Sequence, residues 1–317
     1  MKAFIIDKYK SKDGGRIADV PEPDVLPGDV LVRVHAAGLN LLDSKIRTGE
    51  FKIILPYRFP LILGHDAAGV VVKVGSQVRR FKVGDEVYAR PDKSRIGTFA
   101  EYIAMDEADV ALKPKSISME EAGGIPLVGL TAWQALVEKA DLKKGQKVFI
   151  QAGSGGVGTI AIQLAKHLGA TVATTTSAAN VELVKRLGAD VVIDYKKDDF
   201  ETLLSGYDVV LNSQDPKTLE KSLRILKPGG KLISISGPPD PAFAKELGVP
   251  WYVGLIMKAL SAGVRRKARR LSVNYSFLFM KANGDQLARI TALIDADTIR
   301  SVMDKVFPFQ VTSEVMA

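Results

Sequence analysis

The chain has 317 residues, of which 46% are hydrophobic and 25% are charged, and its formal net charge is +8 at pH 7. This length allows two domains, and the ordinary composition argues against a disordered or fibrous protein. Cysteine is absent, which excludes disulfide bonds, a thiol nucleophile and a cysteine–zinc site, and which fits a reducing compartment.

The amino-terminal residues 1–6 have the pattern of a first strand and lack the basic, apolar and small-residue order of a signal peptide. The longest apolar runs fall well short of the ~20 residues that span a bilayer. We therefore expect a cytoplasmic protein with no membrane partner.

The chain up to residue 118 is rich in strand patterns. Residues 30–35 and 68–74 are β-branched and apolar, while Pro27-Gly28 and Gly84-Asp85 are typical of turns. From residue 119 to residue 139 the pattern becomes helical. These features predict a β-rich first domain followed by a change of architecture.

Strand-like and helix-like segments alternate after residue 139. This alternation indicates an α/β fold, a doubly wound parallel sheet with helices on both faces. Pro228-Gly-Gly230 predicts a turn before the last of these strands, and residues 237–254 are expected to form a loop. The expected strands are 148–150, 170–174, 191–193, 209–211 and 231–235, with helices at 160–168 and 181–187.

Residues 148–158 are the most informative segment, because an apolar strand runs directly into a glycine turn that opens a helix. Gly153, Gly155 and Gly158 have the spacing of a dinucleotide-binding turn. The first allows the tight turn, the second lets a pyrophosphate approach the backbone, and the third lets helix and strand pack closely. Free N–H groups at the helix start would bind the phosphates, so the predicted contacts also include Ser154, Gly156 and Val157.

The residues around the end of the second strand bear on the choice of cofactor. A site that prefers NAD usually has an Asp or Glu there, but residues 171–181 contain no acid. Hydroxyl and amide groups, Ser177 among them, can instead donate hydrogen bonds to the 2′-phosphate of NADP(H), which is the expected cofactor. Because the same residues contain no Lys or Arg, the expected preference is modest.

Motifs along nearly the whole chain resemble those of the medium-chain dehydrogenase/reductase superfamily, specifically its zinc-independent, quinone-oxidoreductase-like branch. Several ordered motifs at family spacing are stronger evidence than one glycine turn. They are Gly38-Leu-Asn-Leu-Leu-Asp43 with Arg47 and Gly49, Leu63-Gly-His-Asp-Ala-Ala-Gly69, Gly84-Asp-Glu-Val-Tyr88, Gly97-Thr-Phe-Ala-Glu-Tyr102, Gly129-Leu-Thr-Ala-Trp133, the turn at 152–158, Leu187-Gly-Ala-Asp190, Asp194-Tyr195 and Lys227-Pro-Gly-Gly230.

The resemblance implies a GroES-like β-barrel domain at residues 1–118, a Rossmann NADP-binding domain at residues 119–296, and a return to the first domain at residues 297–317. Val306-Phe-Pro-Phe309 looks like that return. Family members continue through a helix to a last strand, whereas this sequence ends within the expected helix. The carboxyl-terminal part is therefore expected to be incomplete.

The resemblance also implies an activity, hydride transfer from NADPH to a quinone or an α,β-unsaturated carbonyl such as an enone or enal. Asn40 matches the family position near the nicotinamide ribose, and Thr131 matches the threonine beside the carboxamide. Tyr195 matches a residue that lies near the 2′-phosphate, and Gly237 is a further candidate cofactor contact.

Candidates for the proton donor are less distinctive. Lys45 and Tyr57 can each donate a hydrogen bond to a substrate oxygen, although a packing or surface role is an equal alternative for both. The final proton could also come from water. Asp43 is expected to organise its loop rather than to exchange protons.

No metal is predicted. Zinc-dependent alcohol dehydrogenases of this fold use a cysteine and a His-Glu pair, whereas this chain has Asn40 in the region of the first ligand and Asp66 after His65. His65 is expected to be a hydrogen-bonded structural residue. An alcohol dehydrogenase is the less favoured enzyme alternative, because alkoxide formation would lack a Lewis acid.

The alternative from another class is an NADPH-binding sensor, RNA-binding protein or structural protein with little catalysis. Residues 264–270 hold five basic side chains, but no stacking aromatics accompany them, so a solvated helix face is the simpler interpretation and no nucleic-acid partner is expected. Residues 275–280 are the best candidate for an edge strand that pairs two subunits, and a homodimer is expected.

Overall fold

The structure is a computed structural model that describes residues 1–10, 14–52 and 55–316. It divides into two compact units, Met1–Leu130 with Lys281–Asp297 and Ser301–Ala317, and Thr131–Met280 with Thr298–Arg300. We name them the antiparallel unit and the parallel unit after their sheets. These divisions differ from the expected boundaries at residues 118 and 296.

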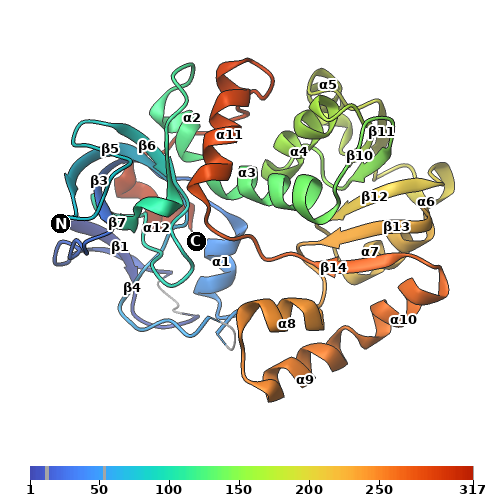
Figure 1. Ribbon diagram of the computed structural model, residues 1–317, viewed down its shortest axis with the longest axis horizontal. Coiled ribbons are helices and arrows are strands. Elements are labelled where there is room, and N and C mark those ends of the chain that lie inside the picture. Colours follow the sequence, from blue (N-terminus) through green and yellow to red (C-terminus); the bar gives the residue numbers. More distant parts are fainter. Residues whose placement is uncertain (11–13, 53–54, 317) are drawn as a thin grey trace. The chain divides into compact units, whose positions relative to one another are not determined.

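The antiparallel unit contains two sheets, with strand orders β7-β3-β5-β6-β8 and β2-β1-β4, and every strand pair in them is antiparallel (Figure 1). Four α-helices and two 3₁₀ turns accompany the sheets. The strands are β1 (Lys2–Ile6), β2 (Arg16–Asp19), β3 (Asp29–Ala36), β4 (Leu61–Ile62), β5 (Ala67–Val74), β6 (Glu86–Ala89), β7 (Tyr102–Asp106) and β8 (Val110–Leu112). The helices are α1 (Leu41–Arg47), α2 (Met119–Gly123), α11 (Gly284–Asp295) and α12 (Thr312–Val315), with 3₁₀ turns η1 (Glu107–Asp109) and η4 (Phe309–Val311).

Alternating β-branched residues build the core of the larger sheet, and they confirm the strands predicted at residues 30–35 and 68–74. Helix α2 packs on β3 and β5, and α11 packs on β8, where Tyr88 Oη donates to the Leu287 carbonyl at 2.8 Å. These contacts explain why residues 119–130 and 281–297 belong to this unit.

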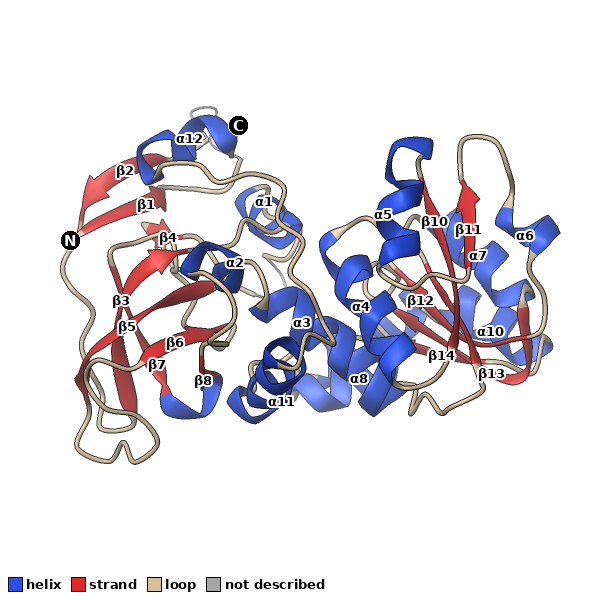
Figure 2. Ribbon diagram, turned by 90° about the horizontal axis from the view of Figure 1, so that it is seen from above, coloured by secondary structure: helices blue, strands red, loops and turns tan. Residues whose placement is uncertain are grey.

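The parallel unit contains a six-stranded sheet in the order β11-β10-β9-β12-β13-β14, with all pairs parallel. Helices cover both faces, α4 and α5 on one and α6, α7 and α10 on the other, so the predicted doubly wound sheet is confirmed (Figure 2). The strands are β9 (Lys147–Ile150), β10 (Thr171–Thr176), β11 (Val191–Asp194), β12 (Tyr207–Asn212), β13 (Leu226–Ser234) and β14 (Asn274–Phe277).

The helices of the parallel unit begin with α3, which starts in the antiparallel unit. A π-helical segment follows α3 directly. The helical elements are α3 (Pro126–Trp133), the π-helix η2 (Gln134–Lys139), α4 (Gly156–His167), the 3₁₀ turn η3 (Ala178–Asn180), α5 (Val181–Arg186), α6 (Phe200–Leu203), α7 (Pro216–Arg224), α8 (Pro241–Leu247), α9 (Trp251–Leu260) and α10 (Ala262–Arg270).

Three expectations about this unit are corrected. The second strand does not end at residue 174, since β10 continues to Thr176. The predicted turn at 228–230 lies within β13, where the register against β12 shifts. Residues 237–254 are not one loop, because Asp240 caps α8 by accepting from Phe243 N and α9 begins at Trp251. Strand β14 does lie at the sheet edge, as predicted.

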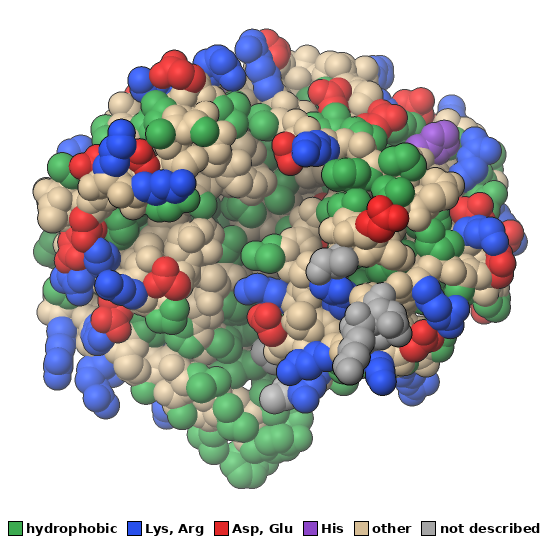
Figure 3. All heavy atoms as spheres, turned by 180° about the vertical axis from the view of Figure 1, so that it is seen from behind, with side chains coloured by type: hydrophobic (Ala, Val, Ile, Leu, Met, Phe, Trp, Pro, Cys, Tyr) green, Lys and Arg blue, Asp and Glu red, His purple; other side chains and the backbone are tan. Residues whose placement is uncertain are grey.

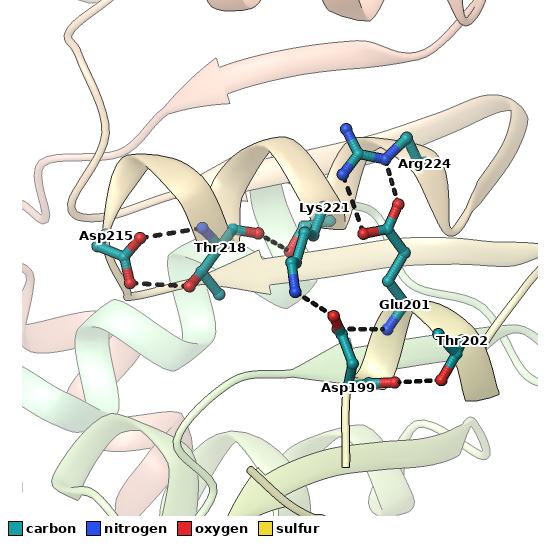
Figure 4. Close-up of polar contacts among 8 residues, drawn as sticks. Asp199, Glu201, Thr202, Asp215, Thr218, Lys221 and Arg224 are labelled. Carbon is teal, nitrogen blue, oxygen red and sulfur yellow. Dashed lines mark hydrogen bonds and ion pairs between the residues drawn. The ribbon is translucent and has the colours of Figure 1, made fainter. Parts of the chain in front are cut away.

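Ion pairs join α6 to α7 on the surface of the parallel unit (Figure 4). Lys221 contacts Asp199, and the Arg224 guanidinium binds Glu201 through two nitrogens. Asp215 caps α7 by accepting from two main-chain N–H groups of the first turn, at 2.8 and 3.0 Å. This network connects α6 to α7, two of the helices that cover one face of the sheet.

Candidate functional site

The glycine turn between β9 and α4 has the geometry of a phosphate-binding turn. An added Cβ at Gly153 would lie 2.2 Å from Thr174 Oγ1, and one at Gly158 would lie 2.3 Å from the Ala152 carbonyl oxygen. At Gly155 the nearest atom would be the same carbonyl oxygen, at 3.3 Å. Gly153 and Gly158 are therefore required by packing, whereas Gly155 leaves space beside the turn.

The start of α4 leaves donors at this space. Gly155 is the N-cap residue and has no side chain to accept from the helix. The first main-chain N–H groups of a helix have no partner within it, which applies here to Gly156, Val157 and Gly158. Ala152 has a φ of 50°, a left-handed value that costs a non-glycine residue free energy and is found mainly at turns and functional sites. The turn can therefore bind an anion with main-chain donors.

The ends of β10 and β11 lie next to this turn. Thr176 Oγ1 and Asn180 Nδ2 both donate to Ser154 Oγ, at 2.9 and 3.3 Å. Ser177 is half-buried, follows β10 directly, and makes no cap hydrogen bond with its side chain. The absence of an acid from 171–181 thus leaves hydroxyl and amide groups at this end of the strand.

Strand β11 and the residues after it add charges next to the end of β10. Asp194 pairs with Thr176 in the sheet, and the exposed Tyr195 follows it, with its main-chain N–H donating to the Thr176 carbonyl at 3.2 Å. Lys197 Nζ lies 3.9 Å from Asp194 Oδ2. Lys196 and Lys197 are exposed, so two cations accompany this acid at the sheet end. The Lys-Lys pair directly after Asp194-Tyr195 is the sequence signal that could have revealed them.

A buried polar network lies beneath the carboxyl ends of the central strands. Asn212 Nδ2 donates to Gln151 Oε1 at 2.8 Å, and Ser234 Oγ donates to Asn212 Oδ1 at 2.6 Å. Gln151 Nε2 reaches Ser222 at 2.7 Å, and the Gly237 N–H donates to Ser234 Oγ at 2.8 Å. Because every one of these links is buried or partly buried, the network holds β9, β12 and β13 in register where their loops begin.

Gly237 and Thr131 have different surroundings from the glycine turn. An added Cβ at Gly237 would lie 2.7 Å from both Leu219 Cδ1 and Tyr275 Oη, so packing requires a glycine there. Thr131 is buried within α3 at the beginning of the parallel unit. Their contacts with a cofactor stay predictions.

In the antiparallel unit, Asn40 and its neighbours form a polar group at the start of α1. Asn40 N donates to Asp43 Oδ2 at 2.8 Å, and Asn40 Nδ2 donates to Asp66 Oδ2 at 2.9 Å. Asp43 Oδ1 lies 2.6 Å from His65 Nδ1, and both side chains are fully buried. His65 is thus hydrogen-bonded and buried, as expected, and Asp43 bonds to the loop at Asn40, while its role in the reaction stays a prediction.

Asp66 is the unusual titratable group of this region. Burial raises the pKa of its carboxyl to about 8, although hydrogen bonds from Asn40 and from Leu127 N, the latter at 2.7 Å, act in the opposite direction. Nearby Arg90 is buried as well, which lowers its pKa, and its Nη1 donates to the Pro91 carbonyl at 2.8 Å. His65 Nε2 and Arg90 Nε are buried without a hydrogen-bond partner among the described residues.

Lys45 and Tyr57 both have protein partners. Lys45 Nζ lies 3.8 Å from Glu50 Oε2. Tyr57 Oη donates to the Lys93 carbonyl at 2.8 Å, and burial raises the pKa of Tyr57. Tyr57 packs on the core that includes Ile46 of α1, so the structure brings it to the region of Asn40 and Lys45. Either group would have to exchange its present partner to bind a substrate oxygen.

Within the described residues, no three His, Asp or Glu side chains gather in a way that could hold a metal ion. None of the described helices is both long enough and apolar enough to cross a bilayer.

Two family profiles match the sequence. One, described as an alcohol dehydrogenase GroES-like domain, matches residues 26–115, and the other, described as a zinc-binding dehydrogenase, matches residues 187–317. The first profile covers the strands β3 to β8 of the antiparallel unit, and the second includes β11 to β14 of the parallel sheet.

Relatives whose names state an oxidoreductase activity match most of the chain. A 2-methylene-furan-3-one reductase of Solanum lycopersicum is 43% identical over 250 residues, which are 76% of this chain and 63% of that protein. A chloroplastic NADPH-dependent alkenal/one oxidoreductase of Arabidopsis thaliana is 35% identical over 318 residues, covering 98% of this chain and 73% of that protein. Among solved structures, the quinone oxidoreductase of Coxiella burnetii has a TM-score of 0.86 at 29% identity, with 99% of this chain and 94% of that chain covered.

The GroES-like profile, the parallel sheet with its glycine turn, and a relative that is 35% identical across nearly the whole chain point to one family. The chain belongs to the medium-chain dehydrogenase/reductase superfamily, in its quinone-oxidoreductase-like branch.

Proposed function

We propose that this protein is a zinc-independent, NADPH-dependent oxidoreductase that reduces a quinone or an α,β-unsaturated carbonyl. The observation that carries the proposal is the contrast between Gly155, which leaves space at the start of α4, and the closely packed Gly153 and Gly158. A dinucleotide turn needs this combination, because only the middle glycine faces the pyrophosphate. The names of the tomato and Arabidopsis relatives support the substrate class.

The residues at the turn fit a dinucleotide. Main-chain N–H groups of Ser154, Gly156, Val157 and Gly158 would donate to the pyrophosphate oxygens. NADPH, when bound, supplies a hydride for the electron-poor carbon of the substrate. The protein's task is to hold and align both molecules, which can lower the barrier without covalent catalysis.

Selection of NADPH would depend on the ends of β10 and β11. Ser177 and Tyr195 can donate hydrogen bonds to the 2′-phosphate, and Lys196 and Lys197 would supply the positive charge that β10 lacks. Asp194 opposes this charge in part. The expected preference for NADPH over NADH is on the order of tenfold to a few hundredfold, since each charged hydrogen bond contributes about 1.5–3 kcal/mol.

The remaining roles follow the family resemblance. Asn40 and Thr131 would lie at the nicotinamide end, where Asp66 holds the Asn40 amide through its hydrogen bond of 2.9 Å. Lys45 or Tyr57 would bind the substrate oxygen that gains negative charge, and water or one of these groups would provide the proton. Asp43 already bonds both Asn40 N and His65, so it fixes the loop.

The test is a kinetic panel of quinones, enals and enones with NADPH and with NADH. We expect NADPH oxidation that depends on a member of the panel and that is lost in Gly155→Val. Lys196→Glu with Lys197→Glu should lower kcat/KM for NADPH but not for NADH, whereas Lys217→Glu, an exposed charge reversal at the start of α7, should change neither. Tight NADPH binding with no oxidation across the panel would contradict the enzyme and favour a sensor or structural protein.

A further inference from the structure

Helix α9 exposes an apolar face. Trp251 is 77% exposed, Tyr252 55%, Leu255 53% and Ile256 56%, and their spacing places them on one side of the helix. Met257, on the opposite side, is buried, and α9 packs there on α8. Figure 3 shows hydrophobic side chains gathered in a projection at the lower edge of the molecule, where α9 lies in Figure 1. We name the four exposed residues the α9 face.

Helix α10 places cations beside this face. Arg266, Arg269 and Arg270 are exposed, and none of them has an acidic partner in the part of the chain that the structure describes. Arg265 Nη2 donates to the Lys258 carbonyl at 3.0 Å, which connects the two helices. Residues 247–284 include no Asp or Glu. The apolar face of α9 and the positive charge of α10 therefore follow one another along the chain with no acidic residue between them.

We propose that α9 and α10 bind the surface of a membrane that contains anionic lipid. An exposed helix face with Trp and Leu inserts its apolar side chains among the acyl chains near the headgroups, and adjacent Lys and Arg bind the acidic headgroups. This is peripheral binding by the folded protein, with no spanning helix. It differs from the expectation from sequence that the protein has no membrane partner.

Charge distinguishes lipid from the other occupants of this surface. A second copy that met the α9 face across a twofold axis would cover the apolar side chains, but its own residues 247–284 would offer no acidic partner to the arginines of α10. A nucleic acid could bind the arginines and stack a base on Trp251 or Tyr252, but it would leave the aliphatic Leu255 and Ile256 in water. An anionic lipid surface matches both the cations and the apolar side chains.

Vesicle flotation tests the proposal directly. The full chain should float with vesicles of phosphatidylcholine mixed with phosphatidylglycerol, should not float with phosphatidylcholine alone, and should dissociate as salt is raised. In a Trp133→Phe variant, Trp251 is the remaining tryptophan of the sequence. Its fluorescence emission should move to shorter wavelength when the mixed vesicles are added, since insertion removes the indole from water.

Three variants make the test specific. Replacing Arg266, Arg269 and Arg270 with Gln should weaken partitioning about a hundredfold, because each cation near an anionic surface contributes about fivefold. Lys8, Lys73 and Lys82, exposed cations of the antiparallel unit, replaced with Gln give a matched control that should bind like the unchanged protein. Trp251→Ala should weaken partitioning about tenfold or more, whereas Leu203→Ala, which also removes an exposed apolar side chain, should not.

Absence of binding to the mixed vesicles, or equal binding by all variants, would overturn the proposal. A protein that does not bind vesicles, and whose dimer dissociates in Trp251→Ala by light scattering, would assign the α9 face to a second copy instead. None of these measurements needs substrate turnover, so they stand apart from the test of the proposed reaction.

Discussion

Replacing Gly155 with Val is expected to remove cofactor binding while the fold survives. The Gly155 backbone is extended, with φ −80° and ψ 166°, which a β-branched residue adopts readily. An added Cβ meets only the Ala152 carbonyl oxygen, at 3.3 Å, so a shift of a few tenths of an ångström accommodates it. We expect a loss of unfolding free energy of about 1 kcal/mol or less.

The effect on binding should be much larger. The Val side chain would fill the space through which a pyrophosphate reaches the main-chain donors of α4. Each hydrogen bond to a charged group contributes about 1.5–3 kcal/mol, so losing one or two of them corresponds to about 3 kcal/mol, or roughly a hundredfold in the Kd for NADPH.

The same substitution at Gly158 is expected to affect the stability of the fold strongly. There an added Cβ would lie 2.3 Å from the Ala152 carbonyl oxygen and 2.7 Å from Gly153 Cα, and main-chain atoms cannot turn away as a side chain can. Gly158→Val should therefore destabilise the parallel unit by about 3 kcal/mol or more. Gly263→Val is the control, because a Cβ at Gly263 meets nothing within 4 Å.

The assay combines urea unfolding, followed by circular dichroism, with NADPH titration followed by fluorescence. Gly155→Val should unfold near the urea concentration of the unchanged protein and bind NADPH about a hundredfold more weakly. Unchanged NADPH affinity in a folded Gly155→Val, or full stability of Gly158→Val, would refute the assignment of this turn.

Three further predictions concern other residues of the structure. Ser177→Asp should reduce or reverse the ratio of kcat/KM for NADPH to that for NADH, because a carboxylate repels the 2′-phosphate; an undiminished ratio would contradict the placement of that phosphate. Since burial raises the pKa of Asp66 to about 8, the folded chain keeps a proton that the unfolded chain releases near pH ~4, so this residue makes stability fall as the pH rises between those values. Asp66→Asn should flatten that part of the profile of melting temperature against pH, and an equal slope in both proteins would contradict the prediction. Asp215→Ala should lower the unfolding free energy by about 1 kcal/mol through loss of the α7 cap, whereas Asp198→Ala, at an exposed position, should not; equal urea midpoints for the two variants would count against the cap.

Local patterns in the sequence were sufficient to predict the alternating strands and helices and the glycine turn. The turn could be predicted because its glycines, the strand before them and the helix after them are consecutive. The end of β10 could not, because the hydrogen bonds that extend it come from Gly153 N to the Thr175 carbonyl and from Tyr195 N to the Thr176 carbonyl. Partners so distant in sequence leave no local pattern.

The candidate site could be predicted from the sequence only in part, for the same reason. The network of Gln151, Asn212 and Ser234 joins three strands whose residues are separated by tens of positions, and none of these residue types is unusual at a strand end. Asp240 likewise caps α8 and also accepts from Phe277 N of β14 at 3.1 Å, so the residues expected to form a loop are helical partly because of a distant strand. The basic run at 264–270 can be recognised from the sequence alone. The exposed apolar face of α9 cannot, because it depends on which side of the helix packs on the rest of the protein.

The division of the chain into two units also bears on the order in which these units can fold during synthesis. The parallel unit is almost continuous, from Thr131 to Met280, whereas the antiparallel unit needs residues from both ends, and Met316 packs in the same core as Phe4 of the first strand. A chain emerging from the ribosome can therefore form the six-stranded sheet of the parallel unit while the antiparallel unit still lacks α11 and α12. The core that holds Phe4 and Met316 therefore joins residues that are synthesised far apart in time, which makes it the later of the two cores to be completed.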